Sequence, residues 1–532
     1  MVVGPNNSGK SVLLREAIAL AIGQRPSGNQ IADKATHLTR GRAEAERFVD
    51  SQESPAVFRR HSLPPDHIFV GRTELTARGI QREGAIEFAM APSIAVPDSA
   101  TAEYFNRIIV PRAIQIDGNG RLSLVSAQPL GDLAAPNSMF ARLLQDDSKR
   151  ELLRKIVFES LGEYCIFDAS AENAQIQLRM SSQAPDLDLE KRPIEHFAKL
   201  RSFDSVDSRS DGVKAFVGVL LQTIAGEPEF LAIDEPEAFL HPGLAHRLGG
   251  HLAKLLGPDQ RVLAATHSSQ FLMGCVQSGS PVTIVRLTYE RGDATARVLL
   301  PAEISHLMLD PLLRSARTLE GIFYDGVVVA EADADRSFYD EIYSRSCAAE
   351  GDRPNPSILF LNAQNKHTLH RLVAPLRRLG IPAVAAIDFD FLSAGAANWR
   401  QLLRAASVSD IDCKALSQAR ALIADRYRTA GVEMSSVGIT QLQGGDRAAA
   451  SNVLIRLAEH GIFVVPNGAL ESWLPNLGVT GPKETWITRI FERMGATPDA
   501  EDYVRPSQDD VWAYLNQIRQ WITNPHRLGM PP

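Results

Sequence analysis

The 532-residue chain has little cysteine and no long apolar run. Its four cysteines, Cys165, Cys275, Cys347 and Cys413, are scattered singly, without the spacing of a metal site or a disulfide framework. No segment approaches the unbroken apolar run of about 20 residues that spans a bilayer. No basic and apolar leader of the signal-peptide type opens the chain. We therefore expect a cytoplasmic protein with reduced cysteines and no membrane partner.

An excess of positive charge is also missing. The 56 lysines and arginines are outnumbered by 63 acidic residues, which gives a net charge of −7 at pH 7. This balance provides no global attraction for nucleic acid, so any DNA binding must rest on local basic patches or on bound metal. The length and the hydrophobic content of 44% predict a globular chain of roughly two to four domains.

The clearest motif present is a phosphate-binding loop, G-x-x-x-x-G-K-[ST], at Gly4–Ser11. Its glycines allow a tight turn, so that backbone N–H groups and the start of the next helix point at a triphosphate. Lys10 would reach the β- and γ-phosphates, and Ser11 would hold Mg²⁺. The residues expected to bind ATP are Gly4, Asn6, Asn7, Ser8, Gly9, Lys10 and Ser11.

A strand at Val2–Val3 is expected before this loop and a helix at Ser11–Ile22 after it. A strand of two or three residues is shorter than the usual five or six. We therefore expect that residues upstream of Met1 are missing from this sequence.

A second part of the ATPase chemistry follows the apolar run Phe230–Ile233. Asp234 would hold Mg²⁺ through water, and Glu235 would polarise the attacking water. The alternative is a strand that merely ends at a charged turn. His267 follows a strand at Arg261–Thr266 and would sense the γ-phosphate, although a surface histidine is the commoner case for such a residue alone. A helix at His246–Leu256 between the two strands indicates a parallel sheet with helical cover.

The run Arg209–Lys214 opens an apolar helix and resembles the S-x-G-x-[QK] signature of ABC-type ATPases. In that family the signature of one subunit contacts the γ-phosphate held by the other, so the resemblance implies that Ser210 and Gly212 bind ATP in a homodimer or a larger even assembly. A plain helix N-cap is the alternative. The Asn6-Asn7 pair and the continuation Glu237–Pro242 look like the SMC, RecF and OLD group. No glutamine can be placed as the lever residue of the family.

Several further elements are expected from local patterns. Alternation around Asp117–Gly120 predicts a hairpin over 113–125, and helical periodicity predicts a helix over Met139–Ser160. Prolines and acids predict an exposed loop at Ser181–Pro193. A helix is expected at Ala302–Leu319, and strands are expected at Gly326–Ala330, Ser357–Leu361, Ala383–Ile387 and Gly461–Val465.

Acidic residues follow two of these strands. Glu331 and Asp335 come after the first, and Asp388 and Asp390 come after the third. Because alternate side chains of a strand share a face, Asp388 and Asp390 are expected to point at one metal. Carboxyl ends of parallel strands meet where ligands bind in open α/β sheets, and hard oxygen ligands suit Mg²⁺ or Mn²⁺. The alternative is that these acids only cap helices.

This arrangement resembles the TOPRIM pattern, E-G-x-x-D followed by D-x-D, with Ala332 in place of the glycine. That departure puts the turn geometry in question. An ABC-type ATPase joined to a TOPRIM domain looks like the OLD family of ATP-dependent DNA endonucleases, several of which belong to phage-defence systems. The resemblance implies DNA as a partner, a possible partner protein from a defence operon, and Glu331 as a metal ligand or general base. The expected α/β organisation is an ATPase domain at 1–300 with an inserted lobe at about 24–200, a linker helix at 301–320, a TOPRIM-like domain at 321–475 and a helical C-terminal cap at 476–532.

Other readings remain open. An ATP-gated sensor or scaffold would bind metal or a partner without cutting, and a RecF-like DNA-repair ATPase would give the acids no role. Lys366 would contact DNA or cover a helix N-terminus, Glu471 would complete a second metal site, and Lys483 would contact phosphate in a loose alignment to the family. The tryptophans expected in the core are Trp473, Trp486, Trp512 and Trp521.

Overall fold

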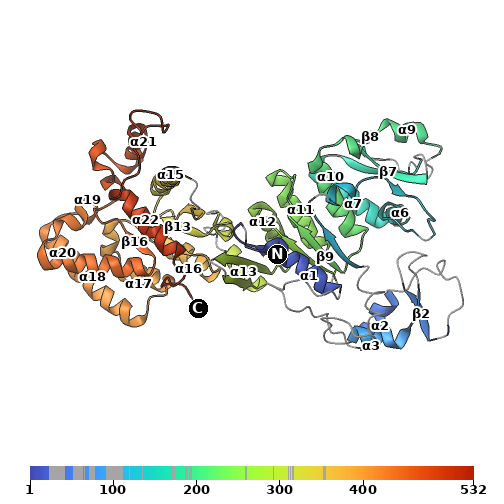
Figure 1. Ribbon diagram of the computed structural model, residues 1–532, viewed down its shortest axis with the longest axis horizontal. Helices are drawn as coiled ribbons and strands as arrows, with labels where there is room; N and C mark the ends of the chain where they lie inside the picture. The colour runs from blue at the N-terminus through green and yellow to red at the C-terminus, as the bar shows by residue number, and fades with distance from the viewer. Residues whose placement is uncertain are drawn as a thin grey trace. The chain divides into compact units, whose positions relative to one another are not determined.

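The computed structural model describes residues 1–6, 8–22, 42–51, 64, 66–70, 78–90, 112–118, 120–134, 136–170, 174–185, 190, 194–257, 260–290, 293–309, 311, 313, 317–351 and 355–531 (Figure 1). The chain divides into two compact units, each of which is described by itself. The first contains Met1–Val3 and Asn7–Pro301, and the second contains Gly4–Asn6 and Ala302–Pro532.

The first unit is built on a six-stranded sheet in the order β12-β11-β1-β10-β9-β4. Neighbours from β11 to β4 run parallel, and β12 is antiparallel to β11. The strands are β1 (Val2–Val3), β4 (Ala113–Ile116), β9 (Phe230–Asp234), β10 (Arg261–Ala265), β11 (Ile284–Glu290) and β12 (Asp293–Leu299). The predictions of strands at β1, β9 and β10 are confirmed.

The helices that accompany this sheet in the described residues include α1 (Lys10–Ala21), α10 (Asp211–Ile224), α11 (Pro242–Leu255) and α12 (Ser269–Gln277). Helix α10 is apolar, and every position from Ala215 to Ile224 is buried. Helix α11 begins earlier than the predicted His246, because the His241 ring accepts a hydrogen bond from Gly243 N at 3.2 Å and Pro242 suits the first helical position.

The predicted hairpin over 113–125 is wrong. Strand β4 is followed by the short helix α5 (Gly120–Ser123), and β4 pairs in parallel with β9. Asp117 Oδ1 accepts a hydrogen bond from Gly120 N at 2.7 Å, which starts a helical turn instead of a hairpin turn. Asn119 lies outside the described residues.

A lobe precedes α10 in the sequence and packs on it. Its small sheet has the order β5-β7-β6, and β8 pairs with β7. The helix predicted at Met139–Ser160 is two helices, because Asp146 accepts a hydrogen bond from Lys149 N at 3.0 Å and starts a new one. The elements are β5 (Gln128–Pro129), α6 (Met139–Gln145), α7 (Asp147–Leu161), β6 (Tyr164–Asp168), β7 (Gln175–Ser181), α9 (Phe197–Ser202), β8 (Asp204–Ser205) and η5 (Val206–Ser208).

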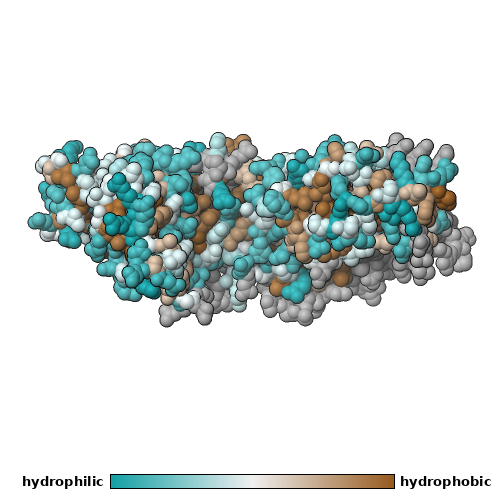
Figure 2. All heavy atoms as spheres, turned by 90° about the horizontal axis from the view of Figure 1, so that it is seen from above, coloured by the Kyte–Doolittle hydropathy of each residue, from teal (hydrophilic) through white to brown (hydrophobic). Residues whose placement is uncertain are grey.

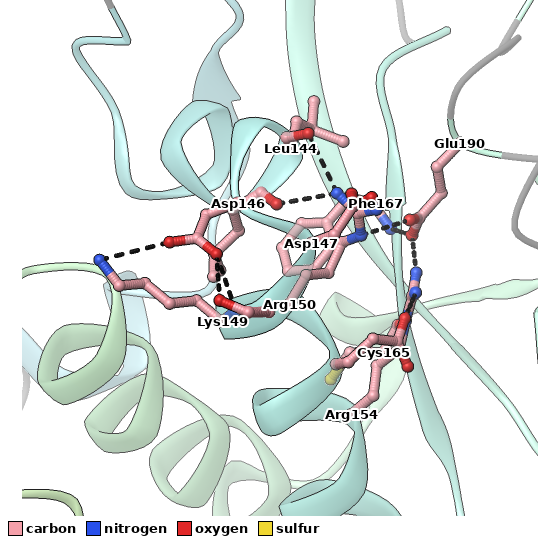
Figure 3. Close-up of polar contacts among 12 residues, drawn as sticks. Leu144, Asp146, Asp147, Lys149, Arg150, Arg154, Cys165, Phe167 and Glu190 are labelled. Atoms are coloured by element: carbon pink, nitrogen blue, oxygen red, sulfur yellow. Dashed lines mark hydrogen bonds and ion pairs between the residues drawn. The ribbon is translucent and has the colours of Figure 1, made fainter.

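A buried ionic cluster centred on Glu190 holds this lobe together (Figure 3). Its carboxylate pairs with Arg150 at 3.1 Å and with Arg154, and it accepts a hydrogen bond from Phe167 N at 2.7 Å. The Glu190 side chain is only 3% exposed. The predicted exposed loop Ser181–Pro193 is therefore wrong at Glu190 and also at Ser181, which is buried at the end of β7. Residues 186–189 and 191–193 lie outside the described residues.

Residues between α1 and β4 also form a small cluster with its own buried core. Strands β2 and β3 pair in antiparallel fashion, and helices α2 and α3 contact each other. The elements are α2 (Arg42–Ser51), β2 (His67–Val70), β3 (Arg78–Gln81) and α3 (Arg82–Met90). The sequence carried no clear fold signal in this region.

The second unit contains a four-stranded parallel sheet in the order β14-β13-β15-β16. The strands are β13 (Gly326–Ala330), β14 (Ile358–Asn362), β15 (Ala383–Ile387) and β16 (Ile462–Val464). All four lie within a residue or two of their predicted ranges. Their runs of valine, isoleucine and alanine are buried, as expected for parallel strands.

Helices before and around this sheet complete the second unit. They are α13 (Pro301–Leu309), α15 (Asp333–Glu350), α16 (Leu369–Arg378), α17 (Ala396–Ala405), α18 (Asp410–Ala430), α19 (Met434–Val437), α20 (Gly444–Glu459), α21 (Lys483–Arg493) and α22 (Asp510–Thr523). The continuous helix predicted at Ala302–Leu319 is wrong at its end. Arg317 has a left-handed φ of 53° and precedes a 3-10 helix, η6 (Thr318–Phe323).

The C-terminal helices α21 and α22 pack on the same core as the sheet. Trp473, Trp486, Trp512 and Trp521 are all buried in this core, as predicted from the sequence. The Trp486 and Phe338 rings meet edge to face, with centroids 5.3 Å apart.

The surface facing the viewer in Figure 2 is mostly hydrophilic, with separate hydrophobic patches. Within the described ranges, none of the helices combines the length and apolar content that a membrane crossing requires.

Candidate nucleotide site and acidic site

The phosphate loop leads directly into helix α1. Gly9 has a left-handed φ of 88°, which a residue without a side chain adopts without strain, and Lys10 begins the helix. The Lys10 ammonium donates a hydrogen bond to Ser8 Oγ at 3.2 Å. Asn7 lies outside the described residues. A helix N-terminus preceded by a glycine turn is the local structure that cradles a phosphate.

The structure brings this loop to the acids that follow β9. The Ser11 hydroxyl donates a hydrogen bond to Asp234 Oδ1 at 3.1 Å across 223 residues of sequence. The sheet order explains the contact, because β10 alone separates β1 from β9. Residues that follow β10, including His267, therefore lie between the loop and the acids.

Glu235 adopts an uncommon backbone conformation at this point. Its φ is 49°, in the left-handed region, where residues other than glycine are strained. Its side chain is more than half exposed, and Oε1 lies 3.9 Å from His267 Nε2. Such strain in an exposed acid beside a phosphate loop is typical of a functional position.

Glu237 ties the end of β10 to the turn after β9. Its carboxylate accepts hydrogen bonds from Thr266 Oγ1 and from His267 N, both at 2.8 Å. Burial raises the pKa of Glu237 above its ordinary value. Glu237 was expected only as the first residue of the Glu237–Pro242 continuation, although its position two residues after Glu235 was a usable signal for a role at the site.

The site is partly desolvated, and this shifts the pKa of its basic groups. Burial lowers the pKa of Lys10 to about 8, although the carboxylates of Glu235 and Asp234 favour the charged form. Burial and the charge of Lys10 lower the pKa of His267 below its ordinary value. Both effects favour the neutral form of the His267 imidazole.

Arg121 is a further residue that the sequence analysis missed. Its guanidinium is fully buried and donates hydrogen bonds to the carbonyls of Asp234 and Glu235, both at 2.5 Å. Burial lowers the pKa of Arg121 from its ordinary value. No motif surrounds this residue, so its role was not visible in the sequence.

The signature residues lie at the start of α10. Ser210 occupies the N-cap position, is exposed, and makes no side-chain capping hydrogen bond. A Cβ at Gly212 would lie 2.6 Å from the Phe239 carbonyl oxygen, so this position requires glycine for close backbone packing. The exposed helix N-terminus has the N–H groups that an anion needs.

The second unit gathers the predicted acids at the carboxyl edge of its sheet. Glu331 follows β13 and Asp388 follows the neighbouring β15, and Glu331 accepts a hydrogen bond from Asp388 N at 3.0 Å. Asp335 lies in the first turn of α15 and accepts a hydrogen bond from Ala332 N at 3.0 Å. Ala332 has a φ of −135°, an extended conformation open to any residue, so the missing glycine does not disturb the turn.

Two lysines neutralise these acids. Lys483 Nζ lies 2.7 Å from Asp335 Oδ1 and 3.4 Å from Asp388 Oδ2. Lys366 Nζ lies 2.5 Å from Asp390 Oδ2, a contact that neither prediction for Lys366 included. Glu471 lies in the short 3-10 helix η9 (Leu470–Ser472).

The expected geometry of Asp388 and Asp390 is wrong. Strand β15 ends at Ile387, and Asp388 caps the 3-10 helix η7 (Phe389–Ser393), which contains Asp390. The two side chains therefore do not alternate along a strand. Among the described residues, no three histidine, cysteine or acidic side chains are arranged to hold a metal ion as they stand.

The crowding of buried carboxylates is nevertheless chemically distinctive. Burial, together with the charges of Asp390 and Asp335, raises the pKa of Glu331 to about 7, although the hydrogen bond from Asp388 N opposes the rise. Burial and Glu331 raise the pKa of Asp388 well above its ordinary value, against the effect of Lys483. Acids in this state gain from a divalent cation, and oxygen ligands of this type suit Mg²⁺ or Mn²⁺.

Comparison with known proteins finds one domain family that matches part of the first unit and one nuclease that is similar to part of this chain. Residues 117–273 match the family described as "AAA domain, putative AbiEii toxin, Type IV TA system". The Old nuclease of Escherichia phage P2 is 26% identical over 168 residues, which are 30% of this chain and 28% of that protein. The match thus spans less than a third of that relative's length.

Similar solved structures include three SMC proteins at low similarity. The SmcHead bound to the C-winged helix domain of ScpA is 11% identical with a TM-score of 0.32, covering 56% of this chain and 89% of that chain. The Smc head domain with an extended coiled coil bound to the C-terminal domain of ScpA, derived from Pyrococcus furiosus, is 10% identical with a TM-score of 0.23, covering 31% and 37%. A structure described as "Structural biochemistry of ATP-driven dimerization and DNA stimulated activation of SMC ATPases" is 9% identical with a TM-score of 0.22, covering 32% and 96%.

The match over residues 117–273 and the parallel sheet support an ATPase domain of the AAA type.

Proposed function

We propose that this chain is an ATP-hydrolysing protein whose second unit is a metal-dependent DNA endonuclease of the TOPRIM type. The observation that carries the proposal is the presence of two separate acidic centres. One is joined to a phosphate loop by the hydrogen bond from Ser11 to Asp234, and the other gathers Glu331, Asp335 and Asp388 at the edge of a parallel sheet. The match to the Old nuclease supports the nuclease part weakly, because it covers 30% of this chain.

In the first centre, Lys10 neutralises the β- and γ-phosphates, and Ser11 with Asp234 holds Mg²⁺. Glu235 orients the attacking water, and His267 contacts the γ-phosphate as a neutral donor. Ser210 and Gly212 of a second copy complete the site from the other side, so the working form is a homodimer or a larger even assembly. The helix N-terminus at Ser210 supports this role because it is exposed and uncapped.

In the second centre, Asp335, Asp388 and Asp390 hold the divalent cation, and Glu331 is a further ligand or the general base. The cation supplies charge stabilisation and lowers the pKa of bound water. Lys483 and Lys366, which pair with these carboxylates, would be available to the phosphate of the DNA once a cation neutralised the acids. The proposed setting is the cytoplasm, in phage defence or DNA processing, with or without a partner protein from a defence operon.

A non-cleaving sensor or scaffold is the second candidate. The bridge from Lys483 to Asp335 and Asp388 favours it, because that bridge satisfies the acids without metal. Incubation of the purified protein with supercoiled plasmid and Mn²⁺ separates the two functions. Nicked or linear plasmid that forms with Mn²⁺ and does not form in the presence of EDTA supports the nuclease. Plasmid that stays intact with ATP, Mn²⁺ and Mg²⁺ supports the scaffold.

A further inference from the structure

The turn that carries Glu235 is held from outside by one arginine. In extended chain, successive carbonyls point in opposite directions, so two neighbouring carbonyls reach one guanidinium only if the chain bends between them. Arg121 contacts the carbonyls of Asp234 and Glu235 at 2.5 Å each, and the left-handed Glu235 provides the bend. The planar fork of an arginine suits this double contact, and a lysine does not reproduce it.

The backbone of Arg121 also touches the helix that begins at the signature. A Cβ at Gly218 of α10 would lie 2.5 Å from the Arg121 carbonyl oxygen, so α5 and α10 are packed backbone to backbone. Through Gly212, the same helix also packs against the carbonyl of Phe239, which lies four residues after Glu235. Helix α10 is thus in contact with Phe239, at the end of the segment that follows β9. It is also in contact with Arg121, which holds the start of that segment at Asp234 and Glu235.

We infer that Arg121 is a positioning residue that holds Glu235 in its left-handed conformation and links the signature helix α10 to ATP hydrolysis. This inference rests on the proposed ATPase activity. Fixing the Glu235 backbone fixes the direction of its Cα–Cβ bond and therefore the place of its carboxylate. Arg121 acts through the backbone that it fixes, because its described hydrogen bonds go to the carbonyls of Asp117, Asp234 and Glu235.

The test compares Arg121→Met and Arg121→Lys with wild type in ATP binding and in steady-state hydrolysis. Misplacement of a catalytic group by about 1 Å costs roughly 10²-fold in rate, so kcat of Arg121→Met should fall by about that factor. Its ATP affinity should stay within about threefold, since Lys10 and the loop are untouched. The kcat of Arg121→Lys should lie between those of wild type and Arg121→Met.

Arg150→Met is the matched control, because Arg150 is equally buried in the same unit and lies in the Glu190 cluster. It should lower the melting temperature without changing kcat of the folded fraction. Gly218→Ala disturbs Arg121 from the other side, because the added Cβ would meet the Arg121 carbonyl oxygen. This variant should lower kcat with little effect on ATP affinity. This variant keeps the inference testable if Arg121→Met does not fold.

A double-mutant cycle with Glu235→Gln decides whether Arg121 acts through Glu235. Arg121→Met should cause little further loss in the Glu235→Gln background, since the carboxylate it positions is already gone. A full additional loss, or wild-type kcat in folded Arg121→Met and Gly218→Ala, overturns the inference. Absence of hydrolysis in the wild type removes the ATPase proposal itself, which is a distinguishable result.

Discussion

At the scale of single residues, Lys10 gives a pH-dependent prediction. Its pKa is about 8 in the protein without nucleotide, because burial disfavours the charge. ATP favours the protonated form, so binding above pH 8 must take up a proton. ATP affinity should be constant below pH 8 and should weaken by up to about tenfold per pH unit above it. Calorimetric titration with a non-hydrolysable ATP analogue from pH 7 to 9.5 measures this dependence.

Lys10→Ala is the control for that titration. It removes the cation that meets the β- and γ-phosphates, so binding should be weak at every pH and should lack the slope above pH 8. Wild-type affinity in Lys10→Ala contradicts the assignment of the loop.

The sequence was informative for residues within motifs and silent for residues that act at a distance. Ser11 and Asp234 were expected to share one ion, and the structure places them in hydrogen-bond contact. Arg121 lies 113 residues from Asp234 and reaches it only through the fold. Lys483 reaches Asp388 across 95 residues, and only a loose family alignment had singled it out. Side-chain pairing of this kind has no local periodicity to detect.

At the scale of elements, Glu190 gives a prediction for stability. Its carboxylate lies between the buried guanidiniums of Arg150 and Arg154. Glu190→Gln leaves these two positive charges without their shared counter-charge, which should lower the free energy of unfolding by about 3 kcal/mol. Urea unfolding monitored by circular dichroism measures the change.

Glu159, a surface acid on the helix α7 that also carries Arg150 and Arg154, provides the comparison. Glu159 pairs with Lys155 at 4.0 Å and is about half exposed, so Glu159→Gln should change stability by less than about 1 kcal/mol. Equal stability of the Glu190→Gln and Glu159→Gln proteins would show that the Glu190 cluster is not essential to the lobe.

Elements with strong burial patterns were predicted well, and elements set by capping were not. The strands β13 and β15 have the bounds expected from their apolar runs. The turn at Asp117 and the break at Asp146 depend on single carboxylates that accept backbone N–H groups. Such side-chain caps act against the pattern of apolar residues from which the elements were predicted. The observed boundaries at Asp117 and Asp146 therefore differ from the predicted ones.

At the scale of the whole molecule, the exposed start of α10 predicts sites shared between two copies. Mixing Ser210→Arg protein with Lys10→Ala protein should restore one working site in each mixed dimer. With random pairing, the mixture should reach about a quarter of wild-type ATPase activity. Each variant alone should be nearly inactive.

The oligomeric state provides an independent readout of the same model. Glu235→Gln should be trapped as a dimer in ATP, because binding survives and water activation is lost. Light scattering with and without ATP measures this state. Absence of rescue on mixing, with a monomeric Glu235→Gln protein in ATP, rules out shared sites.

The central claim is that ATP hydrolysis and DNA cleavage take place at two separate acidic sites, one at Asp234 and Glu235 and the other at Glu331 and Asp388. One measurement tests it: plasmid cleavage and ATPase rate are followed in the same Asp388→Asn sample, beside Asp425→Asn on the exposed face of α18. We predict that Asp388→Asn loses metal-dependent cleavage and keeps its ATPase rate within about twofold of wild type, while Asp425→Asn keeps both activities. Cleavage by Asp388→Asn at the wild-type rate, or an equal collapse of its ATPase activity, would contradict the account.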